Sequence, residues 1–142
     1  MLKFPNKNAL LIFSVILLLS QPLCSQNLVG MKEQAVIKHV STKMADYNRE
    51  TNFVNSSYKY QRYVSNDGLQ TMLAFFNDKG VCIEVRLSFD KSLISSKTKE
   101  LDSIYNRIDE KVWTQRKGSR NYKITLTDDT WYYSLRFRET AK

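Results

Sequence analysis

The sequence has little of what catalytic and metal sites are made from. It contains one histidine, His39, and two cysteines, Cys24 and Cys82. His39 lies within an expected helix, and the strand pattern directs Cys82 away from the helices, so the two are not expected to meet as base and nucleophile. The acidic pairs at 109–110 and 128–129 lack a further oxygen ligand at calcium-loop spacing. The sequence therefore predicts a protein that is not an enzyme and binds no metal or cofactor.

Long hydrophobic runs are also scarce, and the one present lies near the N-terminus. Ala9–Ser20 is an apolar run of about a dozen residues, shorter than the roughly 18 of a membrane-spanning helix. Two lysines precede it, and a polar, turn-prone stretch at 21–26 follows. This layout predicts a signal peptide over 1–25, cut after Ser25, and hence a secreted or periplasmic protein. The alternative is an uncleaved N-terminal anchor.

Cys24 at the end of this leader raises the question of a lipid anchor. The lipid-bearing cysteine of a bacterial lipoprotein normally follows a small residue, whereas here the preceding residue is Leu23. Lipid attachment at Cys24 is therefore the less favoured alternative. Residues 26–142 are then one small domain. Because Cys82 alone remains in it, no internal disulfide can form, and the domain must rely on its packed core.

Apolar periodicity predicts the order of the secondary-structure elements. Val36 and Val40 belong to a stripe at four-residue spacing, which is typical of a helix over roughly 31–45. A second helix is expected near 96–109 from the same kind of spacing. Residues 46–57 show no period and are expected to form a loop. Strands are predicted at 58–64, 69–76, 81–89, 111–116, 121–126 and 131–138.

The second half of the chain resembles the first when the two are aligned with a shift of 50 residues. Gly68 then falls on Gly118, and the three strands on either side need no gap. We therefore predict an α+β domain of two helix-plus-three-strand units, at about 30–90 and 93–139. These units should form one antiparallel sheet with both helices on one face. Independent convergence of hairpin patterns is the alternative explanation.

Strand alternation predicts which side chains the helices leave uncovered. Aromatic and arginine side chains are enriched in protein interfaces, so a helix-free face rich in both indicates a surface for a protein partner of the envelope or the secreted medium. Cross-strand packing on a merely exposed sheet is the alternative. The inward set is expected to be Val81, Ile83, Val85 and Leu87, with Trp131, Tyr133, Leu135 and Phe137. The partner-binding residues are expected to be Leu73, Phe75, Arg86, Tyr132, Arg136 and Arg138.

The chain has a formal net charge of +8, so it carries fewer acids than bases. An exported basic domain is expected to meet anionic lipid, lipopolysaccharide or acidic polysaccharide, and no nucleic acid. Anion binding at a hairpin tip is therefore the second functional prediction, with a solvated hairpin as its alternative. The anion-binding residues would be Arg116, Lys117, Arg120 and Lys123.

Two stretches carry a family resemblance. LVGMKEQAVIKHV, followed by YKY and LQTMLAFFNDKGVCIEVRL, resembles the small exported SmpA/OmlA lipoproteins of outer-membrane assembly and the related β-lactamase-inhibitor-like tandem-repeat domains. The resemblance covers about 60 residues, and the Gly-x-Pro of that family after the first helix is absent. It implies a non-enzymatic envelope protein that binds another protein through its sheet. The matching positions are Gly30, Met31, Glu33, Gln34, Tyr58, Tyr60, Phe76, Asn77, Gly80 and Val81.

Overall fold

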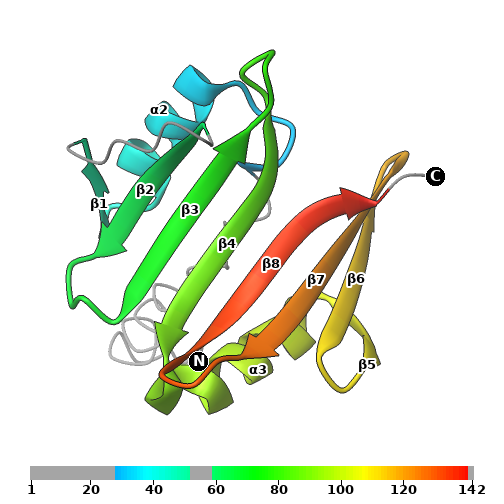
Figure 1. The fold of residues 1–142 in the computed structure, drawn as a ribbon. Coiled ribbons are helices and arrows are strands. Elements are labelled where there is room, and N and C mark those ends of the chain that lie inside the picture. The colour runs from blue at the N-terminus through cyan, green and yellow to red at the C-terminus, as the bar shows by residue number, and fades with distance from the viewer. Residues whose placement is uncertain (1–27, 52–58, 141–142) are drawn as a thin grey trace, which may run out of the picture.

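The computed structural model describes residues 28–51 and 59–140 (Figure 1). The predicted signal peptide and Cys24 lie outside the described residues. Within them the strands form one eight-stranded antiparallel sheet in the order β1-β2-β3-β4-β8-β7-β6-β5. The helical elements are α2 (Glu33–Lys43), the 3-10 helix η2 (Lys91–Leu93) and α3 (Ile94–Ile104). The strands are β1 (Tyr47–Glu50), β2 (Tyr60–Ser65), β3 (Gln70–Phe76), β4 (Cys82–Asp90), β5 (Asn106–Asp109), β6 (Val112–Lys117), β7 (Arg120–Asp128) and β8 (Tyr132–Thr140).

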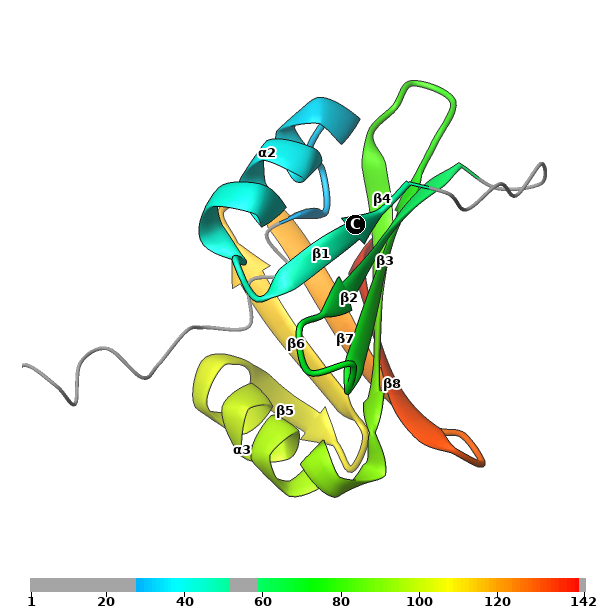
Figure 2. The ribbon, with the colours of Figure 1, turned by 90° about the vertical axis from the view of Figure 1, so that its left-hand side faces the viewer.

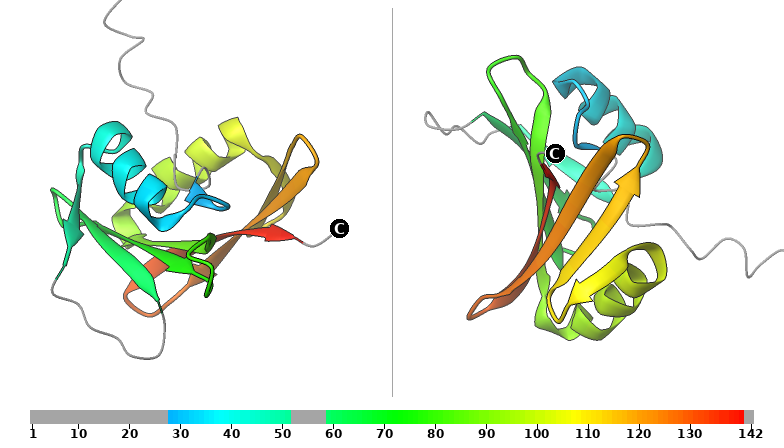
Figure 3. Two further views of the ribbon diagram at one scale, coloured as in Figure 1. Left: turned by 90° about the horizontal axis from the view of Figure 1, so that it is seen from above. Right: turned by 90° about the vertical axis from the view of Figure 1, so that its right-hand side faces the viewer.

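The molecule has two layers, with both helices on the same side of the sheet (Figure 2). Seen from above, the sheet curves around the helices (Figure 3, left). We call the helix-covered side, which carries Val85 and Leu135, the inner face. The convex side, which carries Arg86 and Arg136, is called the open face. Arg86 and Arg136 lie directly opposite each other across β4 and β8, at the centre of the sheet, whereas Val85 is opposite Phe137 and Leu135 is opposite Leu87.

The prediction of two helix-plus-three-strand units is wrong, because each helix is followed by four strands. β1 and β5 form the two edges of the sheet, and each pairs only with the next strand along the chain. The sequence at 46–57 was expected to be a loop, yet Tyr47–Glu50 pairs with β2. The second helix was expected to reach 109, but it ends at Ile104, since Tyr105 is already extended. Edge strands are held by backbone hydrogen bonds on one side and need no apolar alternation, so polar segments can form them.

The predicted shift of 50 residues is visible in the strands nearest the centre. β4 and β8 occupy positions separated by this shift, and they are neighbours in the sheet. Gly68 and Gly118 occupy corresponding turns and have φ angles of 73° and 62°. Glycine adopts this left-handed conformation without the steric cost of a Cβ atom. The two halves of the sheet therefore share the glycine turn between their second and third strands and the length of their last strands, whereas β3 has seven residues and β7 has nine.

The apolar core fills the space between the inner face and the helices. Val36 and Val40 of α2 and Leu101 of α3 are buried against the sheet. Burial of one such side chain stabilises the folded state by about 1.5–3 kcal/mol. No cross-link is needed, and the one described cysteine is free. The largest fully buried side chains include Trp113, Tyr63, Phe89, Phe137, Leu28 and Met72.

A β-bulge in β4 corrects the predicted inward set. Phe75 pairs with Glu84, but the next residue, Phe76, pairs with Cys82, so Ile83 is an extra residue in the strand. A bulge interrupts strict alternation. As a result Cys82 is buried in the core, where Ile83 was expected, and Ile83 is 50% exposed.

Trp131 was also expected to face inward, and it does not. It lies in the turn before β8 and is 83% exposed. The inward alternation begins only with Tyr133, whose ring stacks on Phe89 at a centroid distance of 6.0 Å. The side chains that follow, Leu135 and Phe137, are buried as predicted.

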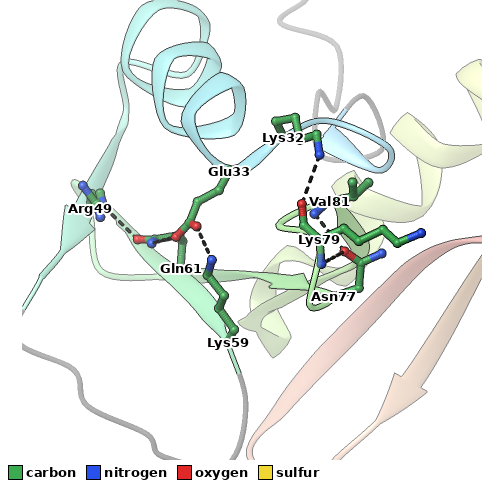
Figure 4. Close-up of polar contacts among 8 residues, drawn as sticks. All are labelled: Lys32, Glu33, Arg49, Lys59, Gln61, Asn77, Lys79 and Val81. Atoms are coloured by element: carbon green, nitrogen blue, oxygen red, sulfur yellow. Dashed lines mark hydrogen bonds and ion pairs between the residues drawn. The ribbon is translucent and has the colours of Figure 1, made fainter.

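Backbone and side-chain hydrogen bonds attach the start of α2 to the sheet (Figure 4). The Glu33 carboxylate forms an ion pair with Lys59 at 2.7 Å and accepts a hydrogen bond from Gln61 Nε2 at 2.7 Å. Gln61 in turn accepts from Arg49 Nε at 2.7 Å. On the other side, Lys32 Nζ donates to the carbonyl of Lys79 at 3.0 Å. These contacts fix α2 over the first half of the inner face and leave the open face uncovered.

Candidate partner-binding face

The predicted partner-binding residues all come from the open face. Residues directly opposite each other on neighbouring strands share a face. Arg62, Leu73, Arg86, Arg136 and Thr125 follow one another in a single row across β2, β3, β4, β8 and β7. The next row along the strands contains Tyr60, Phe75, Glu84, Arg138, Lys123 and Thr114.

The apolar side chains of the open face are half-buried by their neighbours. The Phe75 ring lies 5.6 Å from the ring of Tyr60, and the Arg86 guanidinium lies 5.0 Å from its centroid. Such a cation–π contact is attractive, and the arginine stem shields the ring from water. Leu73 is directly opposite Arg62 and Arg86 in its row. Phe75 and Leu73 are therefore only partly exposed to solvent, and the cations form much of the outermost surface.

Tyr132 lies at the far end of the open face. It is 43% exposed and sits directly opposite Asp90, where β8 begins. The open face thus presents an exposed aromatic ring at one end and its cations nearer the middle.

The Glu84 carboxylate contacts two of the central arginines. Glu84 Oε1 accepts a hydrogen bond from Arg86 Nε at 2.5 Å and forms an ion pair with Arg136, whose Nε lies 3.1 Å away. The Glu84 side chain is only 17% exposed, whereas both arginines remain accessible. Hydrogen bonds to a charged group are stronger than those between neutral groups. Glu84 therefore orients Arg86 and Arg136 and neutralises part of their charge.

The next cations along the sheet form no such ion pair, although Arg138 lies directly opposite Glu84 on β4. Arg138 of β8 lies directly opposite Lys123 of β7, and neither forms an ion pair with any described residue. Arg86 and Arg136 form a second directly opposed pair of like charge. Opposed like charges destabilise a sheet. Glu84 offsets this repulsion between Arg86 and Arg136, whereas no ion pair offsets it between Lys123 and Arg138, which add to the positive charge of the open face.

The predicted anion-binding set of the β6–β7 hairpin is divided between the two faces. Arg116 shares the open face with Thr114 and, on β7, Lys123. Lys117 and Arg120 are opposite each other at the hairpin end and belong to the other face. Arg120 lies against Gly30 and 3.9 Å from a Glu139 carboxylate oxygen. The hairpin tip therefore does not present its four cations together.

Sequence reasoning missed three features of the open face. Nothing in the sequence indicated that Glu84 would bridge two arginines across β4 and β8. Lys123 was assigned to the hairpin tip, whereas its register places it beside Arg138. Ile83 was assigned to the core. A strand alignment of 123 with 138 could have found the second feature, because the two hairpin strands are joined by a short turn.

The residues considered for catalysis lie apart from the open face. Burial raises the pKa of the Cys82 thiol to about 12, so little nucleophilic thiolate forms at neutral pH. Tyr63 Oη and His39 Nε2 are buried without a hydrogen-bond partner in the described chain. No group of three or more metal-ligating side chains gathers among residues 28–51 and 59–140. Over the same residues, no helix has the length and apolar character needed to cross a membrane.

Comparison with known proteins identifies no relative of this chain. No protein-family model matches the chain, and no curated protein or solved structure is significantly similar to it. The resemblance to the SmpA/OmlA lipoproteins stays a prediction from the quoted motifs. Functional inference therefore depends on the open face itself.

Proposed function

We propose that the protein is a non-catalytic binding module that engages a protein partner through the open face. The observation that carries the proposal is the convex sheet surface on which the half-buried Leu73 and Phe75 of β3 lie beside the arginines of β4 and β8. Neither described helix covers it (Figure 2). Sheets of this kind present a broad, preformed surface, so binding requires little ordering of the backbone.

The mixture of side chains favours a protein over a simple polyanion. Phe75, Leu73 and Tyr132 offer apolar contact area that a polysaccharide or polyphosphate chain would not need. Arg86 and Arg136 are held in place by Glu84, so less side-chain entropy is lost when a partner binds. Together with the predicted signal peptide, these features support a partner in the envelope or the secreted medium.

The proposal is tested by affinity capture with substituted proteins. The immobilised protein is exposed to detergent-solubilised envelope and secreted material from the cells that produce it. Arg136→Glu reverses one charge of the open face, and Lys99→Glu makes the same change at an exposed position of α3. A protein retained by the wild type and by Lys99→Glu, but lost with Arg136→Glu and with Phe75→Glu, supports the proposal.

Two outcomes would overturn it. Equal retention by all four proteins would place binding elsewhere on the molecule. Recovery of lipid or polysaccharide alone, released by salt and unaffected by Phe75→Glu, would make this a basic domain that binds anionic lipid, lipopolysaccharide or acidic polysaccharide. That second function predicts a steep dependence on salt and sensitivity at Arg116, Lys117 and Arg120.

A further inference from the structure

We propose that Lys123 and Arg138 form a carboxylate-binding subsite of the open face, and that Glu84 competes with the incoming carboxylates for the neighbouring arginines. The proposal rests on the function proposed above and names the chemistry of the partner. The occupant would be an extended acidic segment of the partner protein, with glutamate or aspartate side chains directed at β7, β8 and β4.

Lys123 and Arg138 are directly opposed, and no acid among the described residues forms an ion pair with either. Glu84 lies opposite Arg138 on β4, but its carboxylate forms ion pairs with Arg86 and Arg136 instead. Directly opposed side chains on antiparallel strands have Cβ atoms about 4.5–5.5 Å apart, so the charges of Lys123 and Arg138 repel. A carboxylate placed between them would relieve this repulsion and accept hydrogen bonds from both.

The spacing of the surrounding cations suits an extended chain. Arg136 is directly opposite Thr125, two residues from Lys123 on β7, so Arg136 and Lys123 are diagonal neighbours. Arg116 is likewise diagonal to Lys123 across β6 and β7. Diagonal neighbours in a sheet are about 7–8 Å apart. Alternate residues of an extended segment are separated by about 6.7 Å, so successive same-side carboxylates can reach successive cations.

Glu84 shows how a carboxylate is bound on this surface. Its Oε1 atom forms ion pairs with two guanidinium groups, those of Arg86 and Arg136, at 2.5 and 3.1 Å. While Glu84 is ionised, both guanidiniums use part of their donor capacity internally. Arginine has five N–H donors, so each can also contact a second acceptor. Replacement of Glu84 by glutamine would remove the competing negative charge and leave the side-chain volume nearly unchanged.

The test measures binding of a defined probe, a fluorescein-labelled octaglutamate peptide, by fluorescence anisotropy at low ionic strength. We expect Glu84→Gln to tighten binding at least about threefold, and Lys123→Gln to weaken it at least about threefold, as expected for single partly exposed ion pairs. The control, Lys99→Gln, makes the same charge change as Lys123→Gln on the outer side of α3 and should alter the affinity less than twofold. Circular dichroism would verify that all variants retain the fold.

Three results would overturn the inference. If Lys99→Gln weakened probe binding as much as Lys123→Gln, the loss of affinity would reflect the net charge of the protein and not a subsite. Unchanged or weaker binding by Glu84→Gln would show that Glu84 does not compete with the probe. Tighter, Lys123-dependent binding of heparin or of inorganic polyphosphate than of octaglutamate would assign the subsite to sulfate or phosphate. Because these outcomes leave the capture experiment with Phe75→Glu unaffected, they would not decide the proposed partner-binding function.

Discussion

The inner and open faces of the same eight-stranded sheet share one backbone but differ in the polarity and burial of their side chains. On the inner face, Val85 and Phe137 are directly opposed and almost fully buried. At the adjacent positions of β4 and β8, Arg86 and Arg136 are opposed on the open face and accessible to solvent. A strand alternates between faces at every residue, so neighbouring positions in the chain can serve unrelated purposes.

This difference separates the residues that specify the fold from those that are available for binding. Apolar side chains on the inner face are held between the sheet and two helices, so substitutions there should act on stability. Side chains on the open face are held mainly by ion pairs and by one cation–π contact. Exposed ion pairs contribute little to stability, typically about 0–1 kcal/mol. Changes on the open face should therefore act on affinity.

The strongest test of the comparison places the same substitution on both faces. Phe137→Glu would bury a carboxylate among core residues, and Phe137 is almost fully buried. We expect this protein to be largely unfolded, because the cost exceeds about 4 kcal/mol, a large fraction of typical domain stability. Phe75→Glu, beside Arg86, should lower the melting temperature by only a few degrees. Circular dichroism during thermal unfolding would measure both.

An equal, large loss of melting temperature in the two phenylalanine variants would contradict the comparison. It would mean that the open face is part of the core rather than a surface for a partner.

A second matched pair compares the two tryptophans. Trp113 is fully buried, and its Nε1 atom donates to Asp102 at 2.7 Å, whereas Trp131 is 83% exposed in the β7–β8 turn. Trp113→Ala should reduce the free energy of unfolding by about 3–5 kcal/mol. Trp131→Ala should change it by about 0.5 kcal/mol or less. Urea titration would give both values, and a large loss for Trp131→Ala would show that the turn is structurally required.

The smallest expected effect concerns the attachment of α2 and its dependence on pH. Hydrogen bonding to Lys59 lowers the pKa of Glu33 from its ordinary value of 4.5. Its stabilisation is therefore complete above that value and is lost as pH falls through the lower, folded-state pKa. Glu33→Gln should reduce the free energy of unfolding by about 0.5–1 kcal/mol at pH 7 and by much less at pH 3. Urea titration of both proteins at both pH values would measure this, and a difference independent of pH would argue against the ion pair.

The sequence predicted the central strands well because their signals are local. Alternation and turn residues such as Asn66–Gly68 placed β2, β3 and β4 close to their observed bounds. β1 and β5 were missed because Tyr47–Glu50 and Asn106–Asp109 are short and polar, and pairing at a sheet edge leaves no apolar pattern. The bulge at Ile83 depends on how β4 pairs with β3, so alternation along β4 alone assigned Ile83 and Cys82 to the wrong sides.

The sequence predicted on which face the candidate residues lie, but not how their charged side chains pair with one another. Strand alternation was enough to place Phe75, Arg86 and Arg136 on the open face. The bridging role of Glu84 and the opposition of Lys123 to Arg138 depend on pairing between strands that are distant in sequence or on the register of a hairpin. The pairing of β4 with β8 joins strands distant in the sequence and leaves no local signal, whereas the register of the β7–β8 hairpin could have been read from its short turn.

Site-specific photo-crosslinking in the producing cells would show whether the open face contacts a protein partner. A benzophenone amino acid would replace Tyr132 on the open face or, as the control, the exposed Ile108 on edge strand β5. If the open face binds a protein, irradiation should produce a discrete crosslinked protein from position 132 and none from position 108, and Arg136→Glu should abolish the product. A crosslinked protein from position 108 alone, or one from position 132 that persists with Arg136→Glu, would contradict the account.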